Sequence, residues 1–313
     1  MNFFIQIFHE ISGRSFAEVV YPLIVPTAVS LLFVSLWMCF FYVYSPKKTI
    51  HFKFLLISFF IGIGAAFLSL AVEQTVITYL DIDSSFLSPS FAAHSINDLL
   101  GPIIFSFLFA AIIEESSKFV LVKKYFDITN VNQVIDGMKI CLISGLGFAF
   151  IENIIYFYDI SSLRASEVVA LFVLRGAFST LAHGIYGIVM GYYLSLSKFY
   201  DKLHTHFYFR ALLASVLVHG LFNFFLIIKL GFYSLFMLLA LLIATILWYN
   251  DRKNLELHIT GGDKTIVVPP FLAEKLELEV WKSKHSSRAD YLDNLWNILL
   301  DTDERKNEPR NLK

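Results

Sequence analysis

Charged residues are scarce in this chain. Asp, Glu, Lys and Arg make up 16% of its 313 residues, whereas soluble domains carry about 25%. Hydrophobic residues make up 57%, with 33 Phe and 15 Tyr in the chain. This composition excludes an ordinary water-soluble domain, because so much apolar bulk cannot face water. The formal net charge of −1 indicates no particular partner, and we expect no nucleic acid.

Cysteine is rarer still. Cys39 and Cys141 are the two cysteines of the chain, and both lie in apolar runs. They cannot form a disulfide framework, and the absence of a CxxC pair or a Cys/His cluster excludes a zinc-finger signature. We interpret both as small core residues.

The two ends of the chain differ from its middle. No basic segment precedes the apolar N-terminus, so we interpret residues 1–19 as an interfacial segment rather than a cleaved signal peptide. From residue 251 to 313 the chain is polar and charged. LAEKLELEVW and YLDNLWNILL in this tail could form short amphipathic helices. The sequence therefore predicts a transmembrane domain over 20–250 and a cytoplasmic appendage after it.

The middle contains seven apolar runs. Each is long enough for a membrane-spanning helix, which needs about 20 mostly apolar residues. The runs are 20–44, 54–80, 100–121, 138–158, 167–196, 210–228 and 231–249. The sequence predicts an all-α polytopic membrane protein with about seven transmembrane helices.

The loops between these runs alternate in charge. Lys or Arg dominates the first, third and fifth loops and the start of the tail, whereas the second loop has Asp and no basic residue. Basic loops remain in the cytoplasm. We therefore predict that the N-terminus lies outside and the C-terminal tail inside.

Several ionisable or amide side chains interrupt the apolar runs. Such residues are expensive in a bilayer and are usually functional. Five of them fall near the middle of four different runs: Glu114, Glu152, His183, His219 and Asn223. We predict that they line one polar cavity at the membrane midplane. Carboxylates and imidazoles can bind zinc, a carboxylate can act as a base on water, and Asn can donate to an oxyanion.

Other polar residues accompany these five. Lys118 follows Glu114 by four positions, so we expect the ammonium to lie over Glu114 while Glu115 turns away. Arg175 could point outward to the membrane surface or compensate a carboxylate. Gly145 and Gly147 precede Glu152 and predict close approach of a neighbouring helix.

Common intramembrane protease signatures are missing. There is no HExxH, because the one His-Glu pair, His9-Glu10, is followed by Ile-Ser-Gly. Ser144-Gly145 has Leu142 where the serine-type GxSG requires glycine, and GGD at 261–263 lies in the polar tail. These absences argue against zincin, rhomboid and aspartyl chemistry.

Four short motifs resemble those of the PrsW family of intramembrane proteases. In order along residues 114–223 they are EESSK at 114–118, DGMKICLISGLGFAFIEN at 136–153, RGAFSTLAHGIYG at 175–187 and HGLFN at 219–223. The second contains the family's FxxxEN core at Phe148, Glu152 and Asn153. The family is related to the type II CAAX prenyl endopeptidases, in which this motif usually carries His instead of Glu. The tail is not covered by the resemblance.

The resemblance implies peptide hydrolysis within the membrane. On this hypothesis Glu114 is the general base, and Glu115 shapes the site or binds Lys118. Glu152 and His183 position the attacking water, either directly or through Zn²⁺, for which His219 is a third candidate ligand. His219 and Asn223 stabilise the oxyanion, and the supporting residues are Lys118, Asn153 and Arg175.

The resemblance also implies partners and a location. We expect the bilayer of a bacterial inner membrane and a membrane-anchored protein substrate, such as an anti-sigma-like regulator cut during signalling. From the residues alone, two alternatives stay open. Midplane carboxylates and histidines can form the relay of a proton- or ion-coupled transporter, and seven spans with the N-terminus outside suit a non-catalytic receptor or binding protein.

Overall fold

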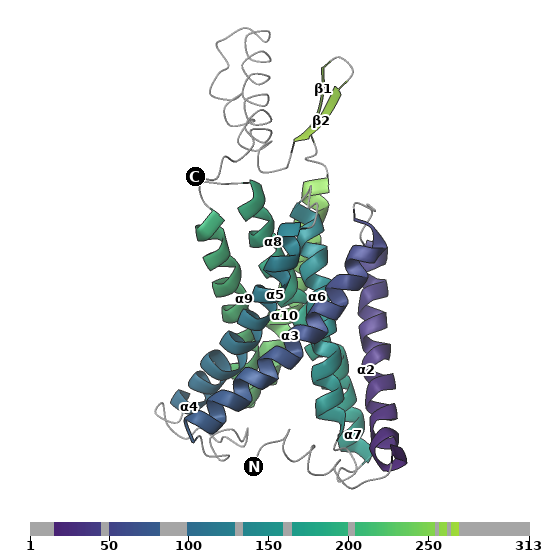
Figure 1. The fold of residues 1–313 in the computed structure, drawn as a ribbon, viewed down its shortest axis with the longest axis vertical. Helices are drawn as coiled ribbons and strands as arrows, with labels where there is room; N and C mark the ends of the chain where they lie inside the picture. Colours follow the sequence, from purple (N-terminus) through teal and green to yellow (C-terminus); the bar gives the residue numbers. More distant parts are fainter. Residues whose placement is uncertain are drawn as a thin grey trace. The chain divides into compact units, whose positions relative to one another are not determined.

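The fold is that of a helical bundle followed by a short strand pair (Figure 1). The computed structural model describes residues 16–44, 50–81, 99–128, 134–158, 165–199, 204–253, 257–261 and 264–268. The chain separates into two compact units, residues 1–244 and 245–313.

Five rods of the bundle are single α-helices. They are α2 (Phe16–Tyr44), α3 (Phe52–Tyr79), α6 (Val134–Tyr158), α9 (His204–Ile227) and α10 (Gly231–Lys253). Helix α6 packs against α2, α3 and α8, and Figure 1 shows α3 running obliquely across the bundle. Helix α6 is therefore the central element around which the site is arranged.

Two further rods are compound. The first consists of α4 (Leu100–Ile104), the π-helix η2 (Phe105–Ala111) and α5 (Ile112–Ile128). The second consists of α7 (Ala165–Leu171), the π-helix η3 (Phe172–Ser179) and α8 (Thr180–Phe199). π-Helical segments are rare and often lie at functional sites. Here each one ends a few residues before a polar residue of the predicted cavity.

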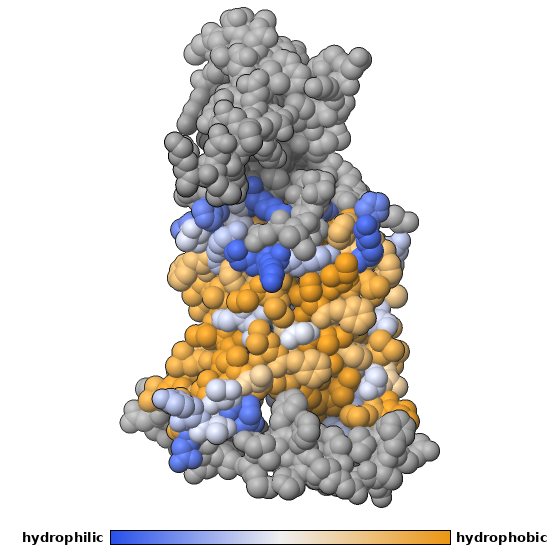
Figure 2. Space-filling view, viewed as in Figure 1, coloured by the Kyte–Doolittle hydropathy of each residue, from blue (hydrophilic) through white to orange (hydrophobic). Residues whose placement is uncertain are grey.

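The outer surface of the bundle is apolar. Figure 2 shows a broad hydrophobic belt on one face of the described helices, with hydrophilic residues gathered at its two ends. Five helical stretches are long and apolar enough to cross a membrane: Leu23–Tyr42, Phe52–Tyr79, Val134–Tyr158, Glu167–Lys198 and His204–Ile227. These findings confirm a polytopic, helical membrane protein. The other two predicted spans, 100–121 and 231–249, are also helical.

Glycines let the central helices approach each other closely, as predicted. A Cβ atom at Gly145 would overlap the backbone carbonyl of His183, and one at Gly147 would overlap the carbonyl of Phe59. Helix α6 therefore contacts α8 on one side and α3 on another through its backbone. This contact holds His183 at a short, fixed distance from α6.

The described part of the tail is a strand pair. Strands β1 (Leu257–Gly261) and β2 (Lys264–Val268) are antiparallel, with Leu257 opposite Val268. The all-helical prediction therefore holds for the bundle but missed these strands. Their signal is a run of Ile, Thr and Val on both sides of Gly-Gly-Asp, which favours a hairpin. The two predicted amphipathic helices, at 272–281 and 291–300, lie outside the described residues.

Candidate active site

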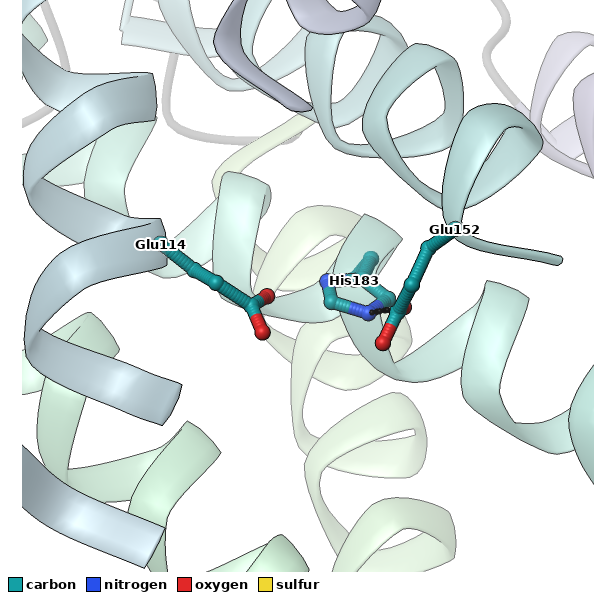
Figure 3. Close-up of side chains that lie close together, drawn as sticks. All are labelled: Glu114, Glu152 and His183. Atoms are coloured by element: carbon teal, nitrogen blue, oxygen red, sulfur yellow. Dashed lines mark hydrogen bonds and ion pairs between the residues drawn. The ribbon is translucent and has the colours of Figure 1, made fainter. Parts of the chain in front are cut away.

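Polar side chains from separate helices meet inside the bundle. Glu114 comes from α5, Glu152 from α6 and His183 from α8, and the three point toward one another (Figure 3). One ligand atom from each lies within 4.8 Å of the others. His219 and Asn223 from α9 join the same hydrogen-bonded cluster. The structure thus brings together all five midplane residues that the sequence singled out.

Glu152 is held by two partners. Arg175 Nη2 donates to its Oε1 at 2.9 Å, and His183 Nε2 lies 2.6 Å from its Oε2. The guanidinium also covers the ring of Tyr156 at 3.2 Å from the centroid and reaches Ser179 Oγ at 3.3 Å. Of the two possibilities for Arg175, the structure shows compensation of a carboxylate.

Lys118 links two parts of the cluster. Its Nζ lies 2.7 Å from Glu115 Oε1 and 2.9 Å from His183 Nδ1. It also lies 3.9 Å from the centroid of the Phe148 ring. The predicted partner, Glu114, is 3.9 Å away. Both carboxylates that the sequence offered to Lys118 are within ion-pair distance: Glu115 is the closer partner, because residues at i and i+3 also share a helix face, and Glu114 is the more distant one.

Each ring nitrogen of His219 has a hydrogen-bond partner. Nδ1 lies 2.8 Å from Glu115 Oε1, and Nε2 lies 3.0 Å from Asn223 Nδ2. A carboxylate only accepts, so Nδ1 carries the hydrogen and Nε2 accepts from the Asn223 amide. The imidazole is thereby oriented by α5 and by the next turn of its own helix.

His183 takes the opposite tautomer. A lysine ammonium only donates, so Nδ1 of His183 accepts from Lys118. Nε2 then carries the hydrogen and donates to Glu152. This assignment follows from the partners rather than from observed hydrogens. Lys118 therefore determines which nitrogen of His183 faces Glu152.

Asn153 acts between helices rather than in the cluster. Its Nδ2 donates to Thr180 Oγ1 at 2.7 Å, and the side chain is fully buried. This bond ties α6 to the first turn of α8. The residue next to Glu152 thus helps to hold α8 in register.

Comparison with known proteins identifies the family of the chain. The family described as PrsW family intramembrane metalloprotease matches residues 51–249. The chain belongs to this family. It is therefore an intramembrane protease, and the match extends well beyond the four motifs, to residues in α3 and α10.

Relatives of the chain in bacteria are named Protease PrsW. Protease PrsW of Clostridioides difficile (strain 630) is 31% identical over 165 residues, which are 52% of this chain and 67% of the relative. Protease PrsW of Geobacillus kaustophilus (strain HTA426) is 27% identical over 172 residues, 54% of this chain and 70% of the relative. No solved structure matches the chain.

The PrsW-family residues of this chain fit a metal ion. Two carboxylates and an imidazole offer oxygen and nitrogen atoms of the kinds that zinc binds. Glu114 Oε2 is buried and has no hydrogen-bond partner among the described residues. The structure groups Glu114 with Glu152 and His183, whereas the sequence grouped His219 with those two.

Sequence reasoning overlooked two residues of this PrsW-family site. Glu73, on α3, lies close enough to interact electrostatically with Glu114 and Glu152. It lies inside the predicted run 54–80, two turns before the end of that run, and the search for residues near the middle of each run did not include it. Tyr186 follows His183 by one turn and stacks on His219, with ring centroids 4.7 Å apart. Its signal was lost among the chain's many aromatic residues.

Proposed function

We propose that this intramembrane protease cuts membrane-anchored proteins at the cluster of Glu114, Glu152 and His183. The observation that carries the proposal is the buried Glu114 Oε2, which has no hydrogen-bond partner among the described residues and belongs to a carboxyl group that faces Glu152 and His183 (Figure 3). A carboxylate oxygen that accepts no other hydrogen bond can accept a proton from water. Glu114 is therefore the proposed general base.

The other two carboxylates of the cluster are less free. Glu115 accepts from Lys118 and His219 through Oε1, although its Oε2 has no hydrogen-bond partner among the described residues, and Glu152 is bound through both oxygens by Arg175 and His183. Their charges are compensated, which suits residues that orient their neighbours. We propose that Glu152 and His183 position the attacking water between them and Glu114.

In the alternative with a metal ion, Glu114, Glu152 and His183 would hold it, with Zn²⁺ as the proposed ion and Glu114 as a ligand in place of a free base. Bound zinc supplies Lewis-acid activation of water or of a peptide carbonyl. To offer Nε2 as a ligand, His183 must give up the hydrogen that it now donates to Glu152. Because Lys118 holds Nδ1, this change requires Lys118 to shift toward Glu114 or Glu115, both of which lie within 3.9 Å.

Asn223 is proposed to assist the developing oxyanion. One of its amide hydrogens faces His219 Nε2, and the other is left for substrate. His219 has its own hydrogen directed at Glu115. Its proposed contribution is thus to hold Asn223 and Glu115 in position.

The proposed setting is a bacterial inner membrane. Seven helices cross it, with residues 1–19 and the N-terminus outside, the domain 20–250 in the membrane and the tail 251–313 in the cytoplasm. The alternating charge of the loops supports this orientation. Membrane-anchored regulators, such as anti-sigma-like proteins cut during signalling, are the proposed substrates.

The test is proteolysis by purified protein in lipid nanodiscs with a single-span substrate. Glu114→Gln keeps the shape of the side chain but removes its basicity, so we expect cleavage to fall by about 100-fold or more. Glu167→Gln is the matched control, because Glu167 lies in the first turn of α7, in the rod that carries His183 but outside the cluster. Metal content is measured on the same samples. Equal cleavage by Glu114→Gln and wild type would refute the assignment.

A further inference from the structure

Tyr186 lies against both imidazoles of the site. It follows His183 by one turn of α8, and helix side chains lean toward the N-terminal end, so the phenol lies over the turn that carries His183. Its ring is 5.5 Å from the His183 ring and stacks on the His219 ring at 4.7 Å and 16°. The side chain is 1% exposed. Its position is therefore fixed by packing.

The hydroxyl of Tyr186 is buried and has no hydrogen-bond partner among the described residues. Buried tyrosine hydroxyls usually find a partner, because an unsatisfied polar group is unfavourable away from water. This hydroxyl lies within electrostatic reach of Glu114, Glu115 and Glu152. A ligand that enters the site is a natural partner for it.

Most other donors around the site are already engaged. Lys118 donates to Glu115 and His183, and Arg175 donates to Glu152 and Ser179. The hydrogens of His183 and His219 are directed at Glu152 and Glu115. The Tyr186 hydroxyl is thus held in place as a donor whose hydrogen has no acceptor among the described residues.

A neutral donor suits this environment. Four carboxylates lie at the site, Glu73, Glu114, Glu115 and Glu152, against two cations, Lys118 and Arg175. An oxyanion formed among these carboxylates needs donors aimed at it in advance. A phenol supplies one without a further buried charge.

We propose that the Tyr186 hydroxyl donates a hydrogen bond to the substrate carbonyl oxygen as that oxygen becomes an oxyanion. This inference rests on the proposed function of the cluster. The O–H bond stays intact, so Tyr186 transfers no proton and binds the transition state more strongly than the ground state. It thereby adds to the donor proposed for Asn223.

The test is Tyr186→Phe, which removes one hydroxyl and keeps the ring. We expect kcat for a single-span substrate to fall by about 100-fold, with little change in KM. We also expect an unchanged or higher melting temperature in detergent, because an unsatisfied buried hydroxyl is removed. Full metal retention by the variant would show that the site still forms.

Tyr125→Phe is the matched control. Tyr125 is also buried, but its hydroxyl donates to the Phe54 carbonyl at 3.1 Å and lies outside the cluster. We expect a lower melting temperature and an unchanged kcat for the folded fraction. The two variants should therefore show opposite patterns of stability and activity.

Two results would overturn the role of Tyr186. One is a stable Tyr186→Phe protein that cleaves like the wild type, which leaves the proposed function standing. The other is a melting temperature that falls as in Tyr125→Phe, since this would place the hydroxyl in a structural bond. Failure of the proposed function itself is recognised separately, by equal cleavage in wild type and Glu114→Gln, and it would remove the inference as well.

Discussion

The polar cluster has two halves that differ in exposure. In one half, Arg175 binds Glu152, and their side chains are 19% and 17% exposed. In the other half, Lys118 binds Glu115, and the exposures are 3% and 0%. Both halves neutralise a carboxylate with a cation, and both hold an imidazole. His183 joins them, because it contacts Lys118 through Nδ1 and Glu152 through Nε2.

The difference in exposure indicates a division of labour. A fully buried ion pair adds little net stability, but loss of one partner leaves an uncompensated charge. The Lys118–Glu115 half therefore behaves as a rigid support that must stay intact for the bundle to fold. The Arg175–Glu152 half is partly exposed, and Glu114, whose Oε2 has no hydrogen-bond partner among the described residues, has a ligand atom within 4.8 Å of Glu152 and His183. We propose that substrate and water meet in this half.

The largest expected effect follows removal of the buried cation. Lys118→Met keeps the length of the side chain but leaves Glu115 with His219 alone. We expect the free energy of unfolding to fall by about 3–5 kcal/mol, measured by titration with SDS in mixed micelles. Lys123→Met, on the same helix but outside the cluster, is the control. A stable Lys118→Met protein would contradict the support role of the buried half.

The second prediction concerns the contact between α6 and α8 at Gly145, which positions His183 between the two halves of the cluster. Gly145→Ala would place a Cβ against the His183 carbonyl, so α6 and α8 must separate and His183 must move from Glu152. We expect a loss of about 1–3 kcal/mol in stability and cleavage reduced by about 100-fold, because small misplacements of catalytic groups have large effects on rate.

Gly64→Ala provides the control for this joint. A Cβ there would meet Leu121 Cδ1 at 3.6 Å, an ordinary contact. Because alanine is the better helix former by up to about 1 kcal/mol, we expect equal or higher stability and unchanged cleavage. Similar behaviour of the two alanine variants would show that backbone contact at Gly145 does not position His183.

Much of this organisation could be predicted from the sequence. Long apolar runs predicted the helices, and the cost of charge in a bilayer drew attention to Glu114, Glu152 and His183. The sequence offered Glu114 and Glu115 as partners of Lys118 but could not rank them, because the i+3 and i+4 positions are both in reach. The π-helices η2 and η3 left no periodic signal, and Glu73 was missed because it lies away from the middle of its run. The roles of these residues in catalysis stay predictions.

The smallest expected change in stability concerns the more exposed half. Arg175→Gln removes the ion pair with Glu152, whose side chain is 17% exposed and keeps His183 as a partner. Because the pair is partly exposed and His183 still holds Glu152, we expect a smaller loss than for the fully buried pair, about 1 kcal/mol. Cleavage should still fall by at least about 10-fold, since Glu152 can rotate away from the water that it positions.

Comparison with Lys118→Met distinguishes the two halves of the cluster. Lys118→Met should mainly lower the free energy of unfolding, whereas Arg175→Gln should mainly lower the rate of cleavage. If Arg175→Gln unfolds the protein as readily as Lys118→Met, the exposed half is also a structural support, and the proposed division of labour fails.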